Sequence, residues 1–585
     1  MIPRLEWLVS TLASMTSVDA GSQSDTGSTT STTSTTSTTS TTSTTSVAVP
    51  EPRDTAESGS MRLSRLILLA VLGVLALGGL LLRVWMLGHN SMDSDQATVG
   101  LMAREILHGH TYAFYWGQGY GGAEPYVVAA VSAVFGQSPL TVNATPSLLA
   151  VIISVLIWRI GLRLFSDMAA LCAAVMAWIW SESTVWNSTK ELGLHQICAV
   201  MGCVVLLEAL RIVQAARTDD GDRLGDWLVL GLAAGVGFWA SPEVVYLALP
   251  AIAAVLISLR RHTLRAALIR TGGAAGMLLV GCLPWIWGTL GGKEASFPPS
   301  PIGYPSRVVS FFSHVLPLLL GLRVKGIGVW EGGPAIGKGL FLVACCLLLA
   351  AMAIVVVRTQ DGWIIVLALA LFPFLYAAFP TSWFWNDGRY AVQLTTLLSL
   401  VVFGALFSVL RPPLVRWAAC VVLAAAFMTT LVAFDSVYGA ITNPSELTTW
   451  TANPNPAILA LAHKLHGIGI SHAYGGYWVA NDLTFVSGGT VTVDNIGYIR
   501  NPPEAGAVLT ADQAAWIFVD PAQATRASLE IGATTNINPG TFNGSAPFID
   551  WLDAHGITYH QYFVDIFDIV VPVHNVTPAE LRRSP

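Results

Sequence analysis

Two aspartates lie close together in the stretch GHNSMDSDQATVGLMAREILHGH, residues 88–110. Asp93 and Asp95 follow a long apolar segment, in a chain of which only 11% of the residues are charged. A carboxylate in such a position could act as a general base that takes a proton from a reacting hydroxyl group. Asp93 also has a structural interpretation, because Asp93 and Gln96 have the spacing of a helix capping box. Asp95 would then lie in the first helical turn, where the helix dipole favours a negative charge.

A second polar and aromatic segment follows in the same region, with the sequence YAFYWGQGYGGAEPY at residues 112–126. Aromatic faces beside a carboxylate are a common way for proteins to hold sugars, because a ring face packs against apolar surface while the acid accepts hydrogen bonds. We therefore predict that Trp116, Tyr120 and Glu124 bind substrate. Aromatic anchoring of the loop is the structural alternative.

Cationic residues that could hold a phosphate group occur in two later segments. Arg389 precedes Tyr390 in NDGRY, and Arg323 and Lys325 lie in LLLGLRVKG. All four residues are predicted to bind substrate. A guanidinium group offers a fork of hydrogen-bond donors that matches phosphate oxygens. The alternative for each cation is an interfacial residue whose charged end reaches the membrane surface.

The elements that must position these residues are membrane spans. Hydrophobic residues make up 53% of the 585-residue chain, and apolar runs of about 20 residues are typical of transmembrane helices. The fold class predicted is a mainly α, polytopic membrane helix bundle with about eleven spans. The predicted spans are residues 64–87, 141–162, 168–186, 192–210, 227–241, 243–259, 271–290, 337–357, 362–380, 390–410 and 417–435.

Arginines concentrate in alternate connections between these spans, and such ends are cytoplasmic by the positive-inside rule. The rule places the N-terminus inside and the C-terminus outside, together with a first outer loop at 88–140 and a second at 291–337. Within the first outer loop, apolar residues from Val99 to Leu107 recur with helical spacing, whereas Gln96 and Arg104 face elsewhere. Tryptophans near the predicted outer ends, among them Trp186, Trp383 and Trp385, resemble an interfacial belt.

The two ends of the chain differ from this core, which we assign to residues 61–435. Residues 1–60 contain repeated STT triplets and are predicted to form a disordered cytoplasmic tail. Residues 436–585 are predicted to form a small extracytoplasmic α/β domain. Its expected helices are NPAILALAHKLHGIG and APFIDWLDAHG, and its expected strands are TVTVD, AAWIFVD and FDIVVPV.

The order of these motifs resembles a known family. SDQATVGLMAREILHG, followed by FYWGQGYGGAEPYVVAAVSAVFGQSP, looks like the first outer loop of the C-type superfamily of membrane glycosyltransferases, which includes protein O-mannosyltransferases and aminoarabinose transferases. The likeness extends through residues 61–435, with GRY at 388–390 opening a late span. It implies that Asp95 is the catalytic base. Gln96 replaces the glutamate usual in the family, which leaves Asp93 as a substitute second acid and a divalent cation as an open question.

The function implied is that of an enzyme, a hexosyl- or pentosyltransferase of the bacterial plasma membrane. It would move a sugar from a polyprenyl-phosphate donor to a glycan, lipid or protein acceptor on the outer face, with inversion. A lipid or sugar transporter and a non-catalytic envelope-assembly protein are the alternatives. The sequence contains no Walker loop, dinucleotide fingerprint or zinc motif, so no cofactor is assigned. A dispersed net charge of −6 argues against nucleic acid as a partner, whereas membrane lipid is expected.

Overall fold

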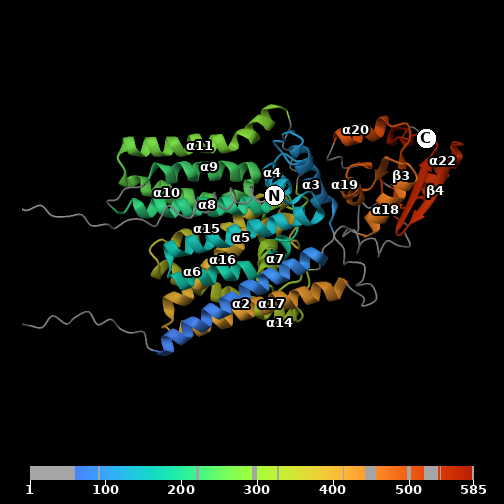
Figure 1. The fold of residues 1–585 in the computed structure, drawn as a ribbon. Helices are drawn as coiled ribbons and strands as arrows, with labels where there is room; N and C mark the ends of the chain where they lie inside the picture. The colour runs from blue at the N-terminus through green and yellow to red at the C-terminus, as the bar shows by residue number, and fades with distance from the viewer. Residues whose placement is uncertain are drawn as a thin grey trace, which may run out of the picture. The chain divides into compact units, whose positions relative to one another are not determined.

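The computed structural model describes residues 59–89, 92–218, 223–292, 300–325, 328–412, 414–441, 456–496, 502–519, 538–540 and 542–582. The predicted Ser/Thr-rich tail lies outside these residues, except that Gly59 and Ser60 belong to the first described helix. The described part of the chain is mainly helical, and it has a small sheet near its C-terminal end (Figure 1).

Each predicted span overlaps a helix of the structure. A bilayer core offers no water to backbone groups, so a long apolar run pairs those groups within a helix. Among the described residues, seven helices are long and apolar enough to cross a membrane, and four more predicted spans fall on shorter apolar helices. The protein is therefore a multi-pass membrane protein, whereas the number of eleven spans stays a prediction. The helices are α2 (Gly59–His89), α5 (Pro139–Leu164), α6 (Asp167–Ile179), α8 (His195–Ala215), α9 (Leu224–Ala240), α10 (Val245–Ser258), α11 (Leu264–Leu290), α14 (Pro334–Arg358), α15 (Gly362–Ala378), α16 (Gln393–Val409) and α17 (Leu414–Ile441).

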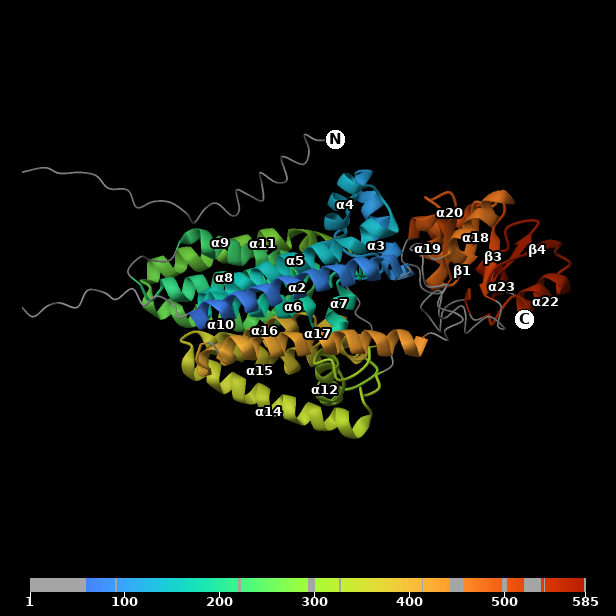
Figure 2. The ribbon, with the colours of Figure 1, turned by 60° about the horizontal axis from the view of Figure 1, so that its bottom comes forward.

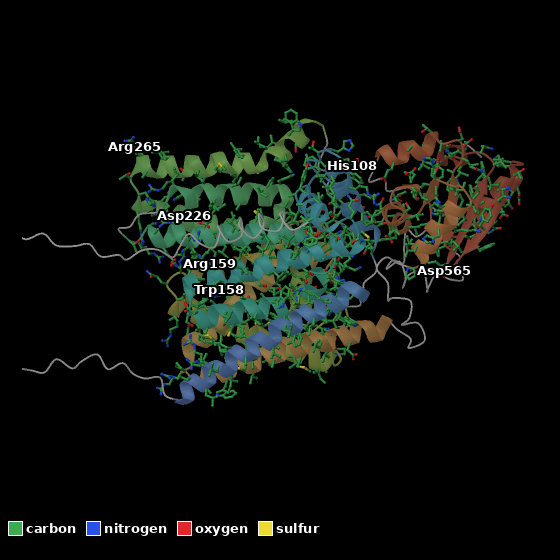
Figure 3. All side chains as sticks on the ribbon, viewed as in Figure 1. His108, Trp158, Arg159, Asp226, Arg265 and Asp565 are labelled. Carbon is green, nitrogen blue, oxygen red and sulfur yellow. The ribbon has the colours of Figure 1, made fainter. Side chains whose placement is uncertain are left out.

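These helices pack side by side, with α9 against both α8 and α11 in two views of the ribbon (Figures 1 and 2). The charged residues Arg159, Asp226 and Arg265 lie toward one end of the helices, and His108 lies toward the other (Figure 3). The shared end of Arg159 and Arg265 agrees with their predicted location on one side of the membrane. The side itself stays a prediction.

Helix α3 (Ser94–Leu107) is the helix predicted in the first outer loop. Its capping box is present, because Asp93 accepts from the backbone of Gln96 and the Gln96 side chain accepts from the backbone of Asp93. Gln96 does not lie on a polar face as expected, since it is fully buried and accepts a hydrogen bond from Asn143 over 3.3 Å. The first two turns of α3 are therefore enclosed by protein.

Short helices connect the long ones on the side of the predicted outer loops. The predicted span 168–186 is interrupted, since α6 ends at Ile179 and α7 (Glu182–Asn187) begins after a break. The Ser183 side chain at the start of α7 donates to the backbone carbonyl of Asp387 over 3.2 Å. The other connecting elements are α4 (Glu124–Phe135), α12 (Tyr304–Ser310), α13 (Leu316–Leu319) and the turns η4 (Pro380–Trp383) and η5 (Arg389–Ala391).

The C-terminal region contains a five-stranded sheet in the order β2-β1-β3-β5-β4. Strand β1 is parallel to β2 and β3, whereas β5 is antiparallel to β3 and β4. All three predicted strands and both predicted helices are present, but β1, α19, α20, β4 and α23 were not predicted. The elements are α18 (Pro456–Gly467), β1 (His472–Gly475), α19 (Tyr477–Val486), β2 (Thr492–Asn495), α20 (Pro502–Thr510), β3 (Ala515–Val519), α22 (Ala546–Ala554), β4 (Tyr559–Val564), β5 (Phe567–Pro572) and α23 (Pro578–Leu581).

The strands β3 and β5 are buried along their whole length, which explains why they read as continuous apolar runs in the sequence. The sheet region is joined to the rest of the described chain through α19, which packs against α3. This contact brings a C-terminal helix next to the two aspartates.

Candidate active site

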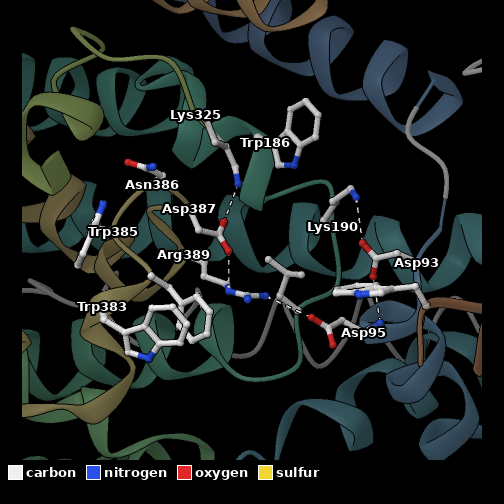
Figure 4. Close-up of a pocket in the computed structure, with 13 residues that line it drawn as sticks. Asp93, Asp95, Trp186, Lys190, Lys325, Trp383, Trp385, Asn386, Asp387 and Arg389 are labelled. Atoms are coloured by element: carbon white, nitrogen blue, oxygen red, sulfur yellow. Dashed lines mark hydrogen bonds and ion pairs between the residues drawn. The ribbon is translucent and has the colours of Figure 1, made fainter. Parts of the chain in front are cut away.

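A cavity of about 550 Å³ lies where α3, α7, the turn before α16 and α19 meet. Its volume is in the range of small-molecule sites in proteins. Figure 4 shows its charged side chains directed toward one another across the opening. The cavity is lined by Asp93, Asp95, Trp186, Lys190, Leu192, Lys325, Trp383, Phe384, Trp385, Asn386, Asp387, Arg389 and Trp478.

Asp93 has a structural role at the start of α3. Its Oδ1 accepts hydrogen bonds from the backbone N–H groups of Asp95 at 3.0 Å and Gln96 at 3.3 Å. Its Oδ2 pairs with Lys190 Nζ over 3.2 Å. Both oxygens are therefore engaged, and the capping interpretation of Asp93 is confirmed, although the side chain also lines the cavity.

Asp95 lies in the first turn of α3, as the capping pattern predicts. Its Oδ2 pairs with Arg389 Nη1 over 3.4 Å, and its Oδ1 accepts a hydrogen bond from the Tyr477 hydroxyl. The backbone carbonyl of Asp95 also accepts from the Tyr115 hydroxyl over 3.0 Å. The carboxylate is thus held by two residues from distant parts of the chain.

Asp387 organises the cations on the other side of the cavity. Lys325 Nζ lies 2.6 Å from Asp387 Oδ1, and Arg389 Nε lies 2.7 Å from Asp387 Oδ2. Burial by itself would raise the pKa of Asp387, but the charges of Arg389 and Lys325 hold that pKa well below its usual value. Arg389 lies between Asp387 and Asp95 (Figure 4). The arginine therefore connects the two acids.

A glycine in the NDGRY motif makes this arrangement possible. Gly388 has a φ of 75°, a left-handed conformation that residues with a side chain rarely adopt. A Cβ atom at this position would lie 2.3 Å from the Ser183 hydroxyl oxygen. The turn can therefore pack against α7 and direct Asp387 and Arg389 into the cavity only with glycine between them.

The structure brings together four of the predicted site residues: Asp93, Asp95, Lys325 and Arg389 line the cavity. Tyr390 does not line the cavity, and its ring lies 4.9 Å from the ring of His195. It supports the Arg389 guanidinium, which lies 5.3 Å from the centre of the Tyr390 ring.

Four other predicted residues do not line this cavity. Trp116 packs edge-on against Tyr112, and both Trp116 and Tyr120 are buried. Arg323 stacks over Trp330 and donates to a backbone carbonyl. The packing of Trp116 and Tyr120 matches the aromatic anchoring that the sequence offered as the alternative.

Glu124, the fourth of these residues, is enclosed in a small adjoining space that it shares with Lys190, His195 and Arg389. Burial raises its pKa, and its Oε2 accepts from the backbone of Ile197 over 3.3 Å. The residue therefore lies behind the cavity, next to the cations that line it.

Several lining residues were not predicted as site residues. Trp186, Trp383 and Trp385 were expected in an interfacial belt, but they form part of the cavity wall. Tyr477 and Trp478 lie in a helix that the sequence pattern did not predict. Their one local signal is the GGYW sequence, in which two glycines precede two adjacent aromatic residues. Among the described residues, no group of three or more His, Cys, Asp or Glu side chains is arranged to hold a metal ion.

The described chain is a multi-pass membrane protein in which a cavity lined by aspartates, lysines and an arginine lies among the connections between the long helices. Residues 123–287 match the family model for dolichyl-phosphate-mannose-protein mannosyltransferase. This segment contains Glu124 and Lys190 but neither Asp95 nor Arg389. No curated protein matches the sequence.

Solved structures with a similar fold include ArnT from Cupriavidus metallidurans bound to undecaprenyl phosphate. It is 14% identical with a TM-score of 0.54, over 89% of this chain and 99% of that chain. Apo ArnT has a TM-score of 0.53 at 14% identity, over 90% of this chain and 99% of that chain. The oligosaccharyltransferase AglB from Archaeoglobus fulgidus has a TM-score of 0.43 at 12% identity, over 80% of this chain and 71% of that chain. The ArnT match shows the fold, and with the family model it confirms the predicted resemblance to the C-type membrane glycosyltransferases.

Proposed function

We propose that this protein is a membrane glycosyltransferase that moves a sugar from a polyprenyl-phosphate donor to a hydroxyl group of an acceptor. The observation that carries the proposal is the pairing of Asp95 with Arg389 in a cavity that Lys325 and Lys190 also line. A base and a set of phosphate-binding cations within one cavity are the groups that this reaction needs. The ArnT-like fold and the family match to residues 123–287 support the same class of reaction.

In the proposed reaction, the acceptor oxygen attacks the anomeric carbon of the donor sugar while Asp95 takes the hydroxyl proton. The bond between the anomeric carbon and the phosphate oxygen breaks, and the polyprenyl phosphate leaves with the electron pair. A phosphate group is a good leaving group, so a second carboxyl group is not required to protonate it, unlike the alcohol that departs in glycoside hydrolysis. Attack from the side opposite the phosphate inverts the anomeric centre.

Arg389 and Lys325 would hold the phosphate group of the donor. An arginine has five N–H donors and a lysine has three, so contacts with Asp387 and Asp95 leave donors for phosphate oxygens. Lys190 on the opposite wall can add a third positive charge. Asp93 has the role of a cap and a partner of Lys190 in this proposal, rather than that of a second catalytic acid.

The reaction would take place on the outer face of a bacterial plasma membrane. The end of the bundle where Arg159 and Arg265 lie is the cytoplasmic end by the positive-inside rule. The helix α3, which carries Asp95, follows α2 on the opposite side under this assignment. A lipid-linked donor presented at the outer membrane surface could then reach the cavity without leaving the bilayer.

The test is the variant Asp95→Asn, compared with the full-length wild type in proteoliposomes that contain polyprenyl-phosphate donors with labelled hexoses or pentoses. We expect loss of sugar transfer by a factor of about 10²–10⁴, because the general base is removed. The matched control is Glu105→Gln on the same helix, where the carboxylate pairs with His110 at the surface. Full transfer by Asp95→Asn would disprove the assignment of the base. Movement of donor lipid across the bilayer without sugar release would instead identify a transporter.

A further inference from the structure

Helix α19 is joined to α3 by buried hydrogen bonds. The Asn481 side chain donates to the Thr98 hydroxyl over 2.9 Å, and the Ser94 hydroxyl donates to the backbone carbonyl of Tyr477. Asn481, Thr98 and Ser94 are all buried. Breaking such a contact leaves buried polar groups without partners, which is unfavourable. The position of α19 relative to the helix of Asp95 is therefore well defined.

The same two helices stay in contact further along α3. An added Cβ at Gly100 would lie 2.5 Å from the ring of Phe485. One turn later, Arg104 donates through Nη2 to the Phe485 carbonyl over 3.0 Å. The contact thus extends from the first turn of α3 to its third. A C-terminal helix with this much contact on the helix of the proposed base belongs to the framework of the site.

The first residues of α19 enter the site itself. The Tyr477 hydroxyl donates to Oδ1 of Asp95, while Arg389 pairs with Oδ2. The carboxylate is therefore oriented from one side by the turn before α16 and from the other by α19. The Trp478 ring lines the cavity together with Asp93 and Asp95. Trp478 packs edge-on against Tyr477, with ring centres 5.0 Å apart at 75°, and this contact fixes the indole orientation.

The chemistry of the proposed function assigns different sides of the cavity to its two substrates. In Figure 4, Lys325 and Asp387 lie on one side and Asp95 on the other, with Arg389 between them. The phosphate of the donor belongs with the cations around Asp387. In an inverting displacement the acceptor approaches from the side opposite the phosphate, next to the base. Tyr477 contacts Oδ1 of Asp95, the oxygen that does not pair with Arg389.

We infer that α19 forms the acceptor subsite: Trp478 packs against a sugar ring of a carbohydrate acceptor, and Tyr477 positions Asp95 toward the hydroxyl of that sugar. An indole ring presents a negative face that favours the C–H groups on the apolar face of a sugar ring. The neighbouring carboxylate accepts hydrogen bonds from sugar hydroxyls. This inference rests on the proposed function and specifies the acceptor class as carbohydrate.

The experiment compares two reactions of the full-length chain in nanodiscs. The first is hydrolysis of a labelled polyprenyl-phosphate hexose or pentose, in which water is the acceptor. The second is transfer of the same sugar to an alkyl glycoside, and a Ser/Thr-containing peptide serves as the competing acceptor class. Trp478→Ala should raise the KM for the glycoside at least about tenfold and lower transfer far more than hydrolysis, because the ring that packs against the acceptor sugar is removed. The control Phe563→Ala removes an exposed aromatic ring from β4 of the same region.

Tyr477→Phe separates the positioning role from acceptor binding. Because Tyr477 acts through Asp95, its loss should lower kcat about tenfold for hydrolysis and transfer alike, with less than about a twofold change in the KM for the glycoside. A purely structural role would instead lower the Tm of the protein without this difference between kcat and KM. An unchanged kcat for Tyr477→Phe would overturn the positioning role.

The remaining outcomes distinguish the inference from the function on which it rests. Absence of any donor consumption by the wild type would refute the proposed function itself. Donor consumption that is stimulated by the peptide but by no glycoside would overturn the carbohydrate assignment. Stimulation by glycosides that is equal in wild type and Trp478→Ala would show that Trp478 has no part in the acceptor subsite.

Discussion

At the scale of single residues, the site depends on how one arginine is shared. Arg389 contacts Asp387 through Nε and Asp95 through Nη1. A planar guanidinium group can make both contacts because its donors diverge in fixed directions. A lysine ammonium group has the same charge but is a compact centre without this planar fork of donors.

We therefore predict that Arg389→Lys lowers kcat/KM for the polyprenyl-phosphate donor by about 10–100-fold, the equivalent of one or two charge-assisted hydrogen bonds. The matched control is Arg323→Lys, because Arg323 stacks on Trp330 and does not line the cavity. Steady-state kinetics with varied donor would measure both. Equal losses for the two variants would contradict the placement of the phosphate at Arg389.

At the scale of elements, α3 and α19 work as a pair. The two helices are held close by the absence of a side chain at Gly100, since an added Cβ would lie 2.5 Å from the Phe485 ring. The sequence does not predict that these two helices meet, because Ser94 and Tyr477 are 383 positions apart in the chain. Their contact is a property of packing.

The substitution Gly100→Ala should separate these helices and lower sugar transfer about tenfold, because Tyr477 would be displaced from Asp95. Overpacking a tight contact costs typically about 1–3 kcal/mol. The double variant Gly100→Ala with Phe485→Leu removes the ring that meets the new methyl group and should recover most of the activity. Transfer assays and Tm measurements on both proteins would test this, and failure of the second substitution to restore activity would argue against a steric cause.

At the scale of the whole molecule, a buried acid near the site makes the free energy of unfolding depend on pH. Glu182 at the start of α7 is fully buried, and burial raises its pKa to about 7 even though the charge of Lys325 acts to lower it. Between about pH 4.5 and pH 7, the folded chain holds a proton that the unfolded chain releases. The stabilisation of the folded state by this proton is therefore complete below about pH 4.5 and is lost as the pH rises through about 7.

For Glu182→Gln we predict that the Tm of the variant increases relative to the Tm of the wild type as the pH rises from 5 to 8, because the variant has no such proton to lose. The difference in the free energy of unfolding between the variant and the wild type should change by about 3 kcal/mol between these two pH values. Thermal unfolding in nanodiscs at both pH values would measure it. Ser183→Ala, an uncharged change in the same helix, controls for disturbance of α7, and a parallel pH dependence of wild type and Glu182→Gln would contradict the prediction.

The sequence by itself determined the local features of this protein. Apolar runs predicted where each long helix lies, because helix formation in a membrane depends on the composition of one continuous segment. The spacing of Asp93 and Gln96 predicted the capping box, and thereby the start of α3 and the position of Asp95 in its first turn. Continuous apolar runs likewise predicted the buried strands β3 and β5.

Only the tertiary structure decided which distant residues meet. It joined Asp95 to Arg389 across 294 positions and to Tyr477 across 382 positions, and it left Trp116 and Tyr120 buried away from the cavity. These outcomes depend on how helices pack, and no local pattern of charge or hydrophobicity records that packing. An aromatic residue reads the same in the sequence whether it faces lipid, a core or a cavity, as Trp186 and Trp385 illustrate.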